Sequence, residues 1–297
     1  MPTNNNPALD VELVVPTDTE TKVLNRIINP AYLKKSEMSN SDRGFLNALI
    51  LRRQPRKCVE LGVSAGGSSV LMLNAIKDIA GAKLYSHDYC TEYYRNPKLK
   101  SGFLVDEYPE LKNQWKLYTG GLALRFLDEI GRDIDFCLID TMHLNPGEIL
   151  DFLMILPYLK NGAMVVFHDI NMHASAKLKL WWRITNNLLI SAIRGQKFIP
   201  GGFFQGNKEL AQFPNIGAVE IDESTRQNLF GIFNLLTIYW PYLPPKIDEE
   251  EIYAHFRKYY SEFYLSYLQT VFTYHREVAK KGRDTLAYRI AEKLKVM

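Results

Sequence analysis

The chain has 297 residues, of which 46% are hydrophobic and 23% charged, and its formal net charge is +3. This composition is typical of a globular protein, and so small a net charge gives no support to a nucleic-acid partner. The most apolar stretch, Leu229 to Trp240, covers about 12 residues and is too short to span a bilayer. Three cysteines without C-x-x-C spacing and a polar N-terminus without an apolar signal core predict a reduced, cytoplasmic protein. We therefore expect a small-molecule partner.

The N-terminal segment is predicted to be loose and then helical. Met1 to about Pro16 is rich in Asn and Pro, which predicts a loose segment. Thr19 to Ile28 has helical spacing, with Thr17 or Thr19 as the N-cap. A second helix is expected from Asp42 to Arg53, capped by Ser41.

The stretch from Lys57 to Ser69 is read as an apolar strand, a glycine-rich turn and the start of a helix. Glycine lets a ligand approach the backbone without meeting a Cβ, so this arrangement forms a nucleotide cradle. A dinucleotide fingerprint would need glycine where Ser64 stands. The carboxylate of Glu60 at the strand tip would repel a pyrophosphate and attract a cation. Both features disfavour an NAD-type Rossmann oxidoreductase, although a plain tight turn in any α/β protein also fits.

The next segments alternate between strand and helix, as a parallel sheet requires. Strands are predicted at Lys83 to Asp88, Trp115 to Tyr118, Asp135 to Asp140 and Ala163 to Phe167, and a turn at Asn161 and Gly162. Two final strands, Gln196 to Ile199 and Asn215 to Ile221, would form an antiparallel edge. The connecting segments are predicted as an insertion with a short helix at Tyr89 to Glu110, a helix at Ala174 to Ala192 and a joining loop at Pro200 to Phe213.

The last quarter of the chain is predicted to be helical. Asp222 to Trp240 forms the first helix, and Asp248 with Glu251 makes a capping box for the next. An apolar aromatic stripe then runs from Ile252 to Tyr274, which suits a core contact, a dimer interface or a sugar-stacking surface. A basic helix follows at Arg283 to Lys295. We divide the chain into an N-terminal helical segment (1–54), a core (55–222) and a C-terminal helical extension (223–297).

Polar residues stand at the carboxyl ends of the central strands, the edge where open α/β sheets bind ligands. Asp88 is placed to accept both ribose hydroxyls of an adenosine cofactor, and His87 is expected to be structural. The tips of the next strands carry Asp140, His143, His168, Asp169 and Asn171. For a reaction at a hydroxyl, two versions are open: His143 or His168 takes the proton, or aspartates hold Mg²⁺ through oxygen ligands. Helix capping and loop bracing are the structural alternatives.

Three motifs in order, V-E-x-G-x-x-x-G-x-S, I-D-x-x-H and V-V-F-H-D-I, resemble the bacterial S-adenosylmethionine-dependent methyltransferases that include macrolide-sugar and cephalosporin-tailoring enzymes. The resemblance covers Arg56 to Asn171. It implies a Rossmann-like class I methyltransferase fold, an α/β architecture with a mostly parallel seven-stranded sheet, helices on both faces and helical additions at both ends. It also implies O-methylation of a small molecule, expected to be a sugar or a glycosylated metabolite.

The resemblance implies roles for individual residues. The cofactor residues would be Glu60, Gly62, Ser64, Gly66, Gly67, Ser68, Asp88 and Asp140. The catalytic residues would be His143, Asp140 and His168, and a metal would be held by Asp140, Asp169 and Asn171, with Mg²⁺ as the candidate. Many relatives carry an acid for the adenine amine near Thr119, where this chain has glycines. The protein is also expected to form a homo-oligomer. An alternative hypothesis is a non-catalytic binding or assembly protein that works through the C-terminal aromatic helix.

Overall fold

The computed structural model describes residues 11–172, 186–201 and 213–283. Three sequence-based expectations therefore lie wholly or largely outside the described residues. They are the first part of the helix at 174–192, which includes Trp181 and Trp182, the joining loop at 200–213 and the basic helix at 283–295.

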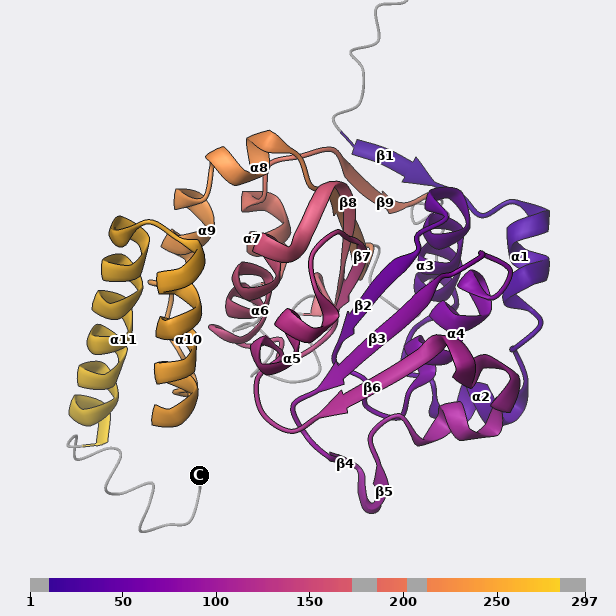
Figure 1. The fold of residues 1–297 in the computed structure, drawn as a ribbon, viewed down its shortest axis with the longest axis horizontal. Helices are drawn as coiled ribbons and strands as arrows, with labels where there is room; N and C mark the ends of the chain where they lie inside the picture. Colours follow the sequence, from indigo (N-terminus) through magenta and orange to yellow (C-terminus); the bar gives the residue numbers. More distant parts are fainter. Residues whose placement is uncertain (1–10, 173–185, 202–212, 284–297) are drawn as a thin grey trace, which may run out of the picture.

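A large sheet forms the centre of the described structure (Figure 1). Its strands are β1 (Val11–Val14), β2 (Lys57–Leu61), β3 (Lys83–Asp88), β6 (Trp115–Thr119), β7 (Ile134–Ile139), β8 (Leu159–His168), β9 (Lys197–Pro200) and β10 (Ile216–Glu220). Their order in space is β1-β9-β10-β8-β7-β2-β3-β6. β10 runs antiparallel to β8 and β9, and the other neighbouring pairs are parallel. The predicted mostly parallel α/β sheet is confirmed, with one strand more than the seven expected.

The additional strand is β1, in a segment that the sequence analysis predicts to be loose. Val11 to Val14 pair in parallel with Lys197 to Pro200 of β9, and Val14 is buried. The expected turn at Asn161 and Gly162 lies inside β8, at a register shift in the pairing with β7, where Gly162 has φ +81°. β1 becomes a strand because its backbone pairs with a distant strand, which local composition does not reveal.

Helices cover both faces of the sheet. They are α1 (Asp18–Leu24), α2 (Pro30–Lys35), α3 (Asn40–Arg53), α4 (Gly67–Ile76), α5 (Leu124–Ile130), α6 (Gly147–Ile155), α7 (Asn186–Ala192), α8 (Glu223–Gln227), α9 (Phe230–Leu235), α10 (Lys246–Tyr259) and α11 (Glu262–Arg283). Strand residues alternate between the faces. In β2, Cys58 faces the core beneath α1, α3 and α4, whereas Val59 and Leu61 face the core beneath α5, α6 and the C-terminal helices.

The N-terminal helices begin at side-chain caps. Thr17 caps α1 as predicted and forms a capping box with Glu20. α3 is capped by Ser39 and not by Ser41, because the Asp42 carboxylate accepts a hydrogen bond from the Ser39 backbone N–H and completes the capping box there.

The insertion after β3 is an antiparallel ribbon followed by two short 3₁₀ helices. The ribbon consists of β4 (Glu92–Tyr93) and β5 (Asn96–Lys100), and the helices are η1 (Phe103–Glu107) and η2 (Pro109–Gln114). A further 3₁₀ turn, η3 (Leu156–Tyr158), joins α6 to β8. The predicted insertion with a short helix is confirmed, although that helix, η1, is of the 3₁₀ type and a ribbon precedes it.

The C-terminal extension forms separate helices that pack on the core (Figure 1). The segment predicted as one helix, Asp222 to Trp240, is divided into α8 and α9. The aromatic stripe is also divided, since α10 ends at Tyr259 and α11 runs beside it. The predicted capping box of Asp248 and Glu251 is wrong, because α10 begins two residues earlier, at Lys246. Within the described ranges, no helix is both long and apolar enough to cross a membrane.

Candidate active site

A cavity of about 1000 Å³ opens at the carboxyl ends of the central strands. Its walls come from the glycine-rich loop after β2, from the tips of β3, β7 and β8, and from the segment that leads into α10. The cavity thus lies where open α/β sheets bind their ligands.

The glycine-rich loop passes close to neighbouring backbone. Gly62 has φ +89°, and a Cβ there would lie 1.9 Å from the carbonyl oxygen of Asp140. A Cβ on Gly67 would lie 2.9 Å from the Ser36 Cα, and one on Gly66, with φ +95°, would lie 3.0 Å from the Gly102 Cα. Each position requires glycine because backbone occupies the space that a side chain would need.

Ser64 and Asp88 join this loop to the tip of β3. One carboxylate oxygen of Asp88 accepts hydrogen bonds from the backbone N–H groups of Val63 (3.0 Å) and Ser64 (2.8 Å). The other oxygen accepts from the backbone N–H of Cys90 at 2.9 Å. Asp88 lines the cavity, and a lone pair remains on the second oxygen for a ligand hydroxyl. The Ser64 Oγ is buried and has no hydrogen-bond partner among the described residues.

His87, next to Asp88, is held by the backbone. Its Nε2 lies 3.0 Å from the carbonyl oxygen of Gly121. Burial lowers the pKa of His87 to about 4, so the ring is neutral at physiological pH. This environment agrees with the structural role expected for it.

Glu60 lies beneath the loop, outside the cavity wall. It is fully buried and accepts hydrogen bonds from the hydroxyls of Ser68 (2.5 Å), Ser69 (2.6 Å) and Ser86 (2.5 Å). Burial raises the pKa of Glu60 to about 7, although the three hydroxyls oppose that shift. The sequence analysis places Glu60 against the cofactor, whereas the structure makes it a support for the first turn of α4.

Glu60 is expected to make stability depend on pH. Its pKa of about 7 in the folded state exceeds the ordinary 4.5, so its stabilising contribution is full below pH 4.5 and is lost as the pH rises through 7. The loss amounts to about 3 kcal/mol. Glu60→Gln removes this titration. Urea unfolding measures the free energy of unfolding of both proteins at pH 4.5 and pH 8. The difference in this free energy between wild type and Glu60→Gln should change by about 3 kcal/mol between the two pH values. The exposed Glu110→Gln serves as a control. Equal pH dependence in wild type and Glu60→Gln would refute the assignment.

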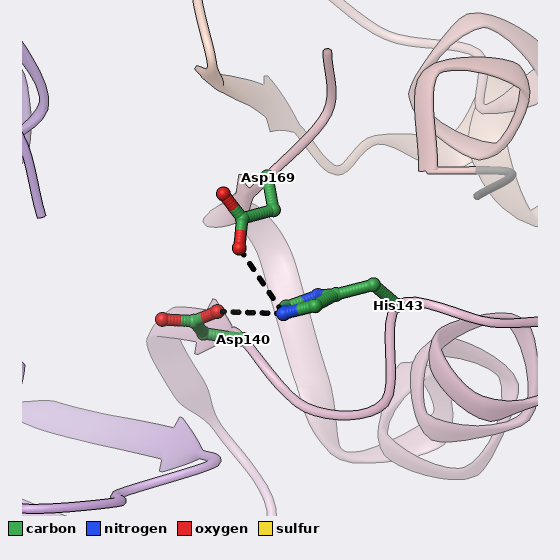
Figure 2. A group of neighbouring side chains, drawn as sticks. All are labelled: Asp140, His143 and Asp169. Atoms are coloured by element: carbon green, nitrogen blue, oxygen red, sulfur yellow. Dashed lines mark ion pairs between the residues drawn. The ribbon is translucent and has the colours of Figure 1, made fainter. Parts of the chain in front are cut away.

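Asp140, His143 and Asp169 converge on one point of the cavity wall (Figure 2). The His143 Nε2 lies 3.1 Å from the Asp169 Oδ2 and 3.9 Å from the Asp140 Oδ1. The three side chains can each offer one ligand atom, and these atoms lie within 4.8 Å of one another. Asp140 follows β7 and Asp169 follows β8, so neighbouring parallel strands bring the two carboxylates together.

The ring of His143 is oriented by Glu148, which the sequence analysis missed. The Nδ1 of His143 lies 2.9 Å from the Glu148 Oε1, and Glu148 is buried in the first turn of α6. Burial opposes protonation of His143, but the hydrogen bond and charge of Glu148, with the charges of Asp140 and Asp169, outweigh it and raise the pKa to about 9. An acid in the first turn of a mostly apolar helix was the available signal.

His168 lies behind the two aspartates. Its Nδ1 is 3.3 Å from the Asp140 Oδ1, and its Nε2 is 3.5 Å from the Asp42 Oδ2 of α3. Burial opposes its charge, but Asp140, Asp169 and Asp42 together raise the pKa of His168 well above its usual value. His168 also counteracts the burial of Asp140 and keeps the pKa of that carboxyl low. The geometry favours a positively charged brace over a proton acceptor.

Asn171 turns away from this group. Its side-chain amide donates to the Pro214 carbonyl oxygen at 2.6 Å, and its backbone N–H donates to Asn215 at 3.1 Å. The Asn215 amide in turn donates to the Asp169 Oδ1 at 2.5 Å. Among the described residues, His143 lies beside Asp140 and Asp169, whereas the Asn171 amide, which the sequence predicts as a metal ligand, is engaged by Pro214.

Comparison with known proteins adds one finding about this part of the chain. Residues 59–170 match a family model described as a methyltransferase domain. This segment is a methyltransferase domain. Together with the sheet order, the match confirms the predicted Rossmann-like methyltransferase fold.

Solved structures similar to the methyltransferase domain and its surroundings have low sequence identity to this chain. An O-methyltransferase from Bacillus cereus in complex with SAH is 16% identical, covers 70% of this chain and 93% of its own, and gives a TM-score of 0.46. The O-methyltransferase TomG from Streptomyces achromogenes is 15% identical, with coverages of 70% and 92% and a TM-score of 0.43. A methyltransferase from Geobacter sulfurreducens is 17% identical, with coverages of 70% and 91% and a TM-score of 0.42. No curated protein matches.

The methyltransferase domain brings most of the predicted site residues to one cavity. Those that line it are Gly62, Ser64, Gly67, Ser68, Asp88, Asp140, His143, His168 and Asp169. The other three do not line the cavity. Gly66 packs against the Gly102 backbone, Glu60 accepts a hydrogen bond from Ser68, and Asn171 donates one to Pro214.

Proposed function

We propose that the chain is an S-adenosylmethionine-dependent O-methyltransferase that acts on a small molecule. The observation that supports this most is the shared cavity, which has the glycine-rich loop and Asp88 in one wall and the Asp140, His143 and Asp169 group in another. S-adenosylmethionine carries a sulfonium and an ammonium and no phosphate, so a wall rich in carboxylates suits it better than it suits NAD.

Methyl transfer is an in-line displacement, in which the acceptor oxygen attacks the methyl carbon and the sulfonium leaves as a thioether. The protein must align the oxygen and remove its proton. His143 lines the cavity, and we assign the proton to its Nε2, which lies beside Asp140 and Asp169 while Glu148 fixes the ring. A positioned base of this kind contributes about 10²- to 10⁴-fold to the rate.

The same residues fit a divalent metal. Asp140 and Asp169 would supply oxygen ligands and His143 a nitrogen ligand, with Glu148 orienting the ring. Mg²⁺ prefers oxygen ligands, so a set that contains an imidazole also suits Mn²⁺ or Zn²⁺. A bound ion would lower the pKa of the acceptor hydroxyl. We propose this metal site as the second version of the mechanism.

The pH dependence of activity should separate the two versions. His143 must lose its proton either to act as a base or to bind a metal, and its pKa is about 9. With a chelator present, activity is expected to rise with pH toward about 9. If a metal is used, adding Mn²⁺ or Mg²⁺ should move this rise to lower pH, because the metal competes with the proton. A profile that is flat between pH 6 and pH 9 in chelator would contradict the role of His143.

We propose a sugar or a glycosylated metabolite as the acceptor. Tyr94 and Tyr242 line the cavity and supply aromatic rings for packing against a sugar, and Lys35 and Glu37 add polar groups to the lining. The test is a screen of sugars, glycosides and phenols with a labelled methyl donor, with and without divalent metals. Methyl transfer to sugars or glycosides would support a carbohydrate acceptor. Methyl transfer to phenols alone would contradict it.

We also propose a cytoplasmic location, a division of the chain into three parts and a homo-oligomeric state. The free thiols of Cys58, Cys90 and Cys137 support a reduced, cytoplasmic protein. The division into 1–54, 55–222 and 223–297 is supported by the match that begins at residue 59 and by the separate helices after β10. Light scattering of the purified protein would test for a homo-oligomer.

A further inference from the structure

The cavity has two ends. β7 and β8, which carry Asp140 and Asp169, lie on one side of β2 in the sheet, and β3 and β6 lie on the other. Asp88 at the tip of β3 therefore belongs to the end away from the reacting group. If the proposed function is right, the ribose lies near Asp88 and the adenine ring lies beyond it. The tip of β6 is Thr119, followed by Gly120 and Gly121, and offers no acid there.

An acid reaches this end from the C-terminal extension. Asp248, in the first turn of α10, lines the cavity, and its side chain is only 3% exposed. The hydroxyl of Tyr89, the residue after Asp88, donates to the Asp248 Oδ2 at 2.9 Å. Arg125 of α5, the helix after β6, donates to the Asp248 Oδ1 at 3.4 Å. Core elements that follow β3 and β6 thus hold this carboxylate in place.

The surroundings of Asp248 suit a flat ring that carries an amino group. Each carboxylate oxygen has two lone pairs, and one donor from the described residues reaches each. Leu122, Pro245 and Ile252 line the same cavity and provide apolar surface. A buried carboxylate beside apolar side chains recognises an N–H donor on an otherwise apolar ring, because leaving that acceptor unpaired is costly.

We propose that Asp248 accepts a hydrogen bond from the 6-amino group of the cofactor's adenine, which makes α10 part of the cofactor site. This assignment rests on the proposed function. It gives the C-terminal extension a specific task, which is to close the adenine end of the cavity and to select adenine over a purine with a 6-carbonyl group.

The test compares two ligands that differ at that position. S-adenosylhomocysteine carries the 6-amino group, and S-inosylhomocysteine carries a carbonyl there. Calorimetry with wild type should show the adenine compound binding at least about tenfold more tightly. Asp248→Asn should reduce the ratio of the two affinities by about tenfold, because the Asn amide can donate a hydrogen bond to the 6-carbonyl group of S-inosylhomocysteine. Glu251→Gln is the matched control, since Glu251 also pairs with Arg125 but does not line the cavity, and its ratio should stay at the wild-type value.

The outcomes separate the assignment from the function on which it rests. A wild-type ratio near one overturns the assignment even if Asp248→Asn fails to fold, and so does an unchanged ratio in a folded Asp248→Asn. In both cases binding of S-adenosylhomocysteine leaves the proposed function intact. If wild type binds neither compound, the proposed function fails and the assignment fails with it.

Discussion

His143→Gln is expected to lower kcat for methyl transfer by about 10²- to 10⁴-fold and to leave the affinity for S-adenosylhomocysteine within about twofold. His143 presents its Nε2 to the cavity between Asp140 and Asp169, and Glu148 holds its Nδ1. Both versions of the mechanism need that nitrogen, either as a base or as a metal ligand. The variant keeps the glycine-rich loop and Asp88, so the cofactor contacts should survive.

The control for this prediction is a buried histidine outside the cavity. The ring of His275 stacks on Trp240, and its Nε2 lies 3.1 Å from the Leu236 carbonyl oxygen. His275→Gln removes comparable packing and should leave kcat of the folded protein near that of wild type. Initial rates with an acceptor from the screen, together with calorimetry, measure both effects. A rate for His143→Gln within about threefold of wild type would contradict the assigned role.

Gly62→Ala is expected to destabilise the protein by about 3 kcal/mol or more. The residue has φ +89°, and its new Cβ would lie 1.9 Å from the Asp140 carbonyl oxygen. The obstacle is backbone, so the loop after β2 and the tip of β7 must separate. Because that separation moves Asp140, cofactor binding should weaken as well.

Gly81→Ala measures the strain of a positive φ alone, without the steric clash expected in Gly62→Ala. Gly81 has φ +74°, and apart from its two chain neighbours no described residue has an atom within 4 Å of the position of its Cβ. The variant should lose only about 1 to 2 kcal/mol, the strain of an alanine with positive φ. Urea unfolding of both variants gives the comparison. Equal losses would show that the contact between Gly62 and Asp140 is not tight.

The central strands were predictable because their signals are local. Apolar runs bounded by turns predicted β2, β3, β6 and β7, and parallel pairing then placed Asp88 and Asp140 at the same edge. β1 was not predictable, since Val11 to Val14 become a strand only through pairing with β9, far away in the sequence. The capping box predicted for Asp248 is absent because α10 begins at Lys246, and the Asp248 carboxylate instead accepts hydrogen bonds from Tyr89 and Arg125, which come from other parts of the chain.

Side-chain direction limited the prediction of the site. Glu60 and Asp88 both look like strand-tip acids in the sequence, but Glu60 is inside β2 and faces the serines in the first turn of α4. Asn171 follows Asp169, whose φ is +54°, and its side chain turns to Pro214. His143 comes close to Asp169 because Glu148 holds its ring. Such orientations depend on side-chain contacts that form on folding, whether local, as between His143 and Glu148, or distant, as between Asn171 and Pro214.

The most direct test of the account is calorimetric titration of the purified protein with S-adenosylmethionine, S-adenosylhomocysteine and NAD. We expect the first two to bind at a single site with dissociation constants on the order of micromolar, and NAD not to bind. Binding of NAD alone would favour an oxidoreductase. Binding of none of the three would leave the cavity without a nucleoside cofactor and would contradict the proposed methyl transfer.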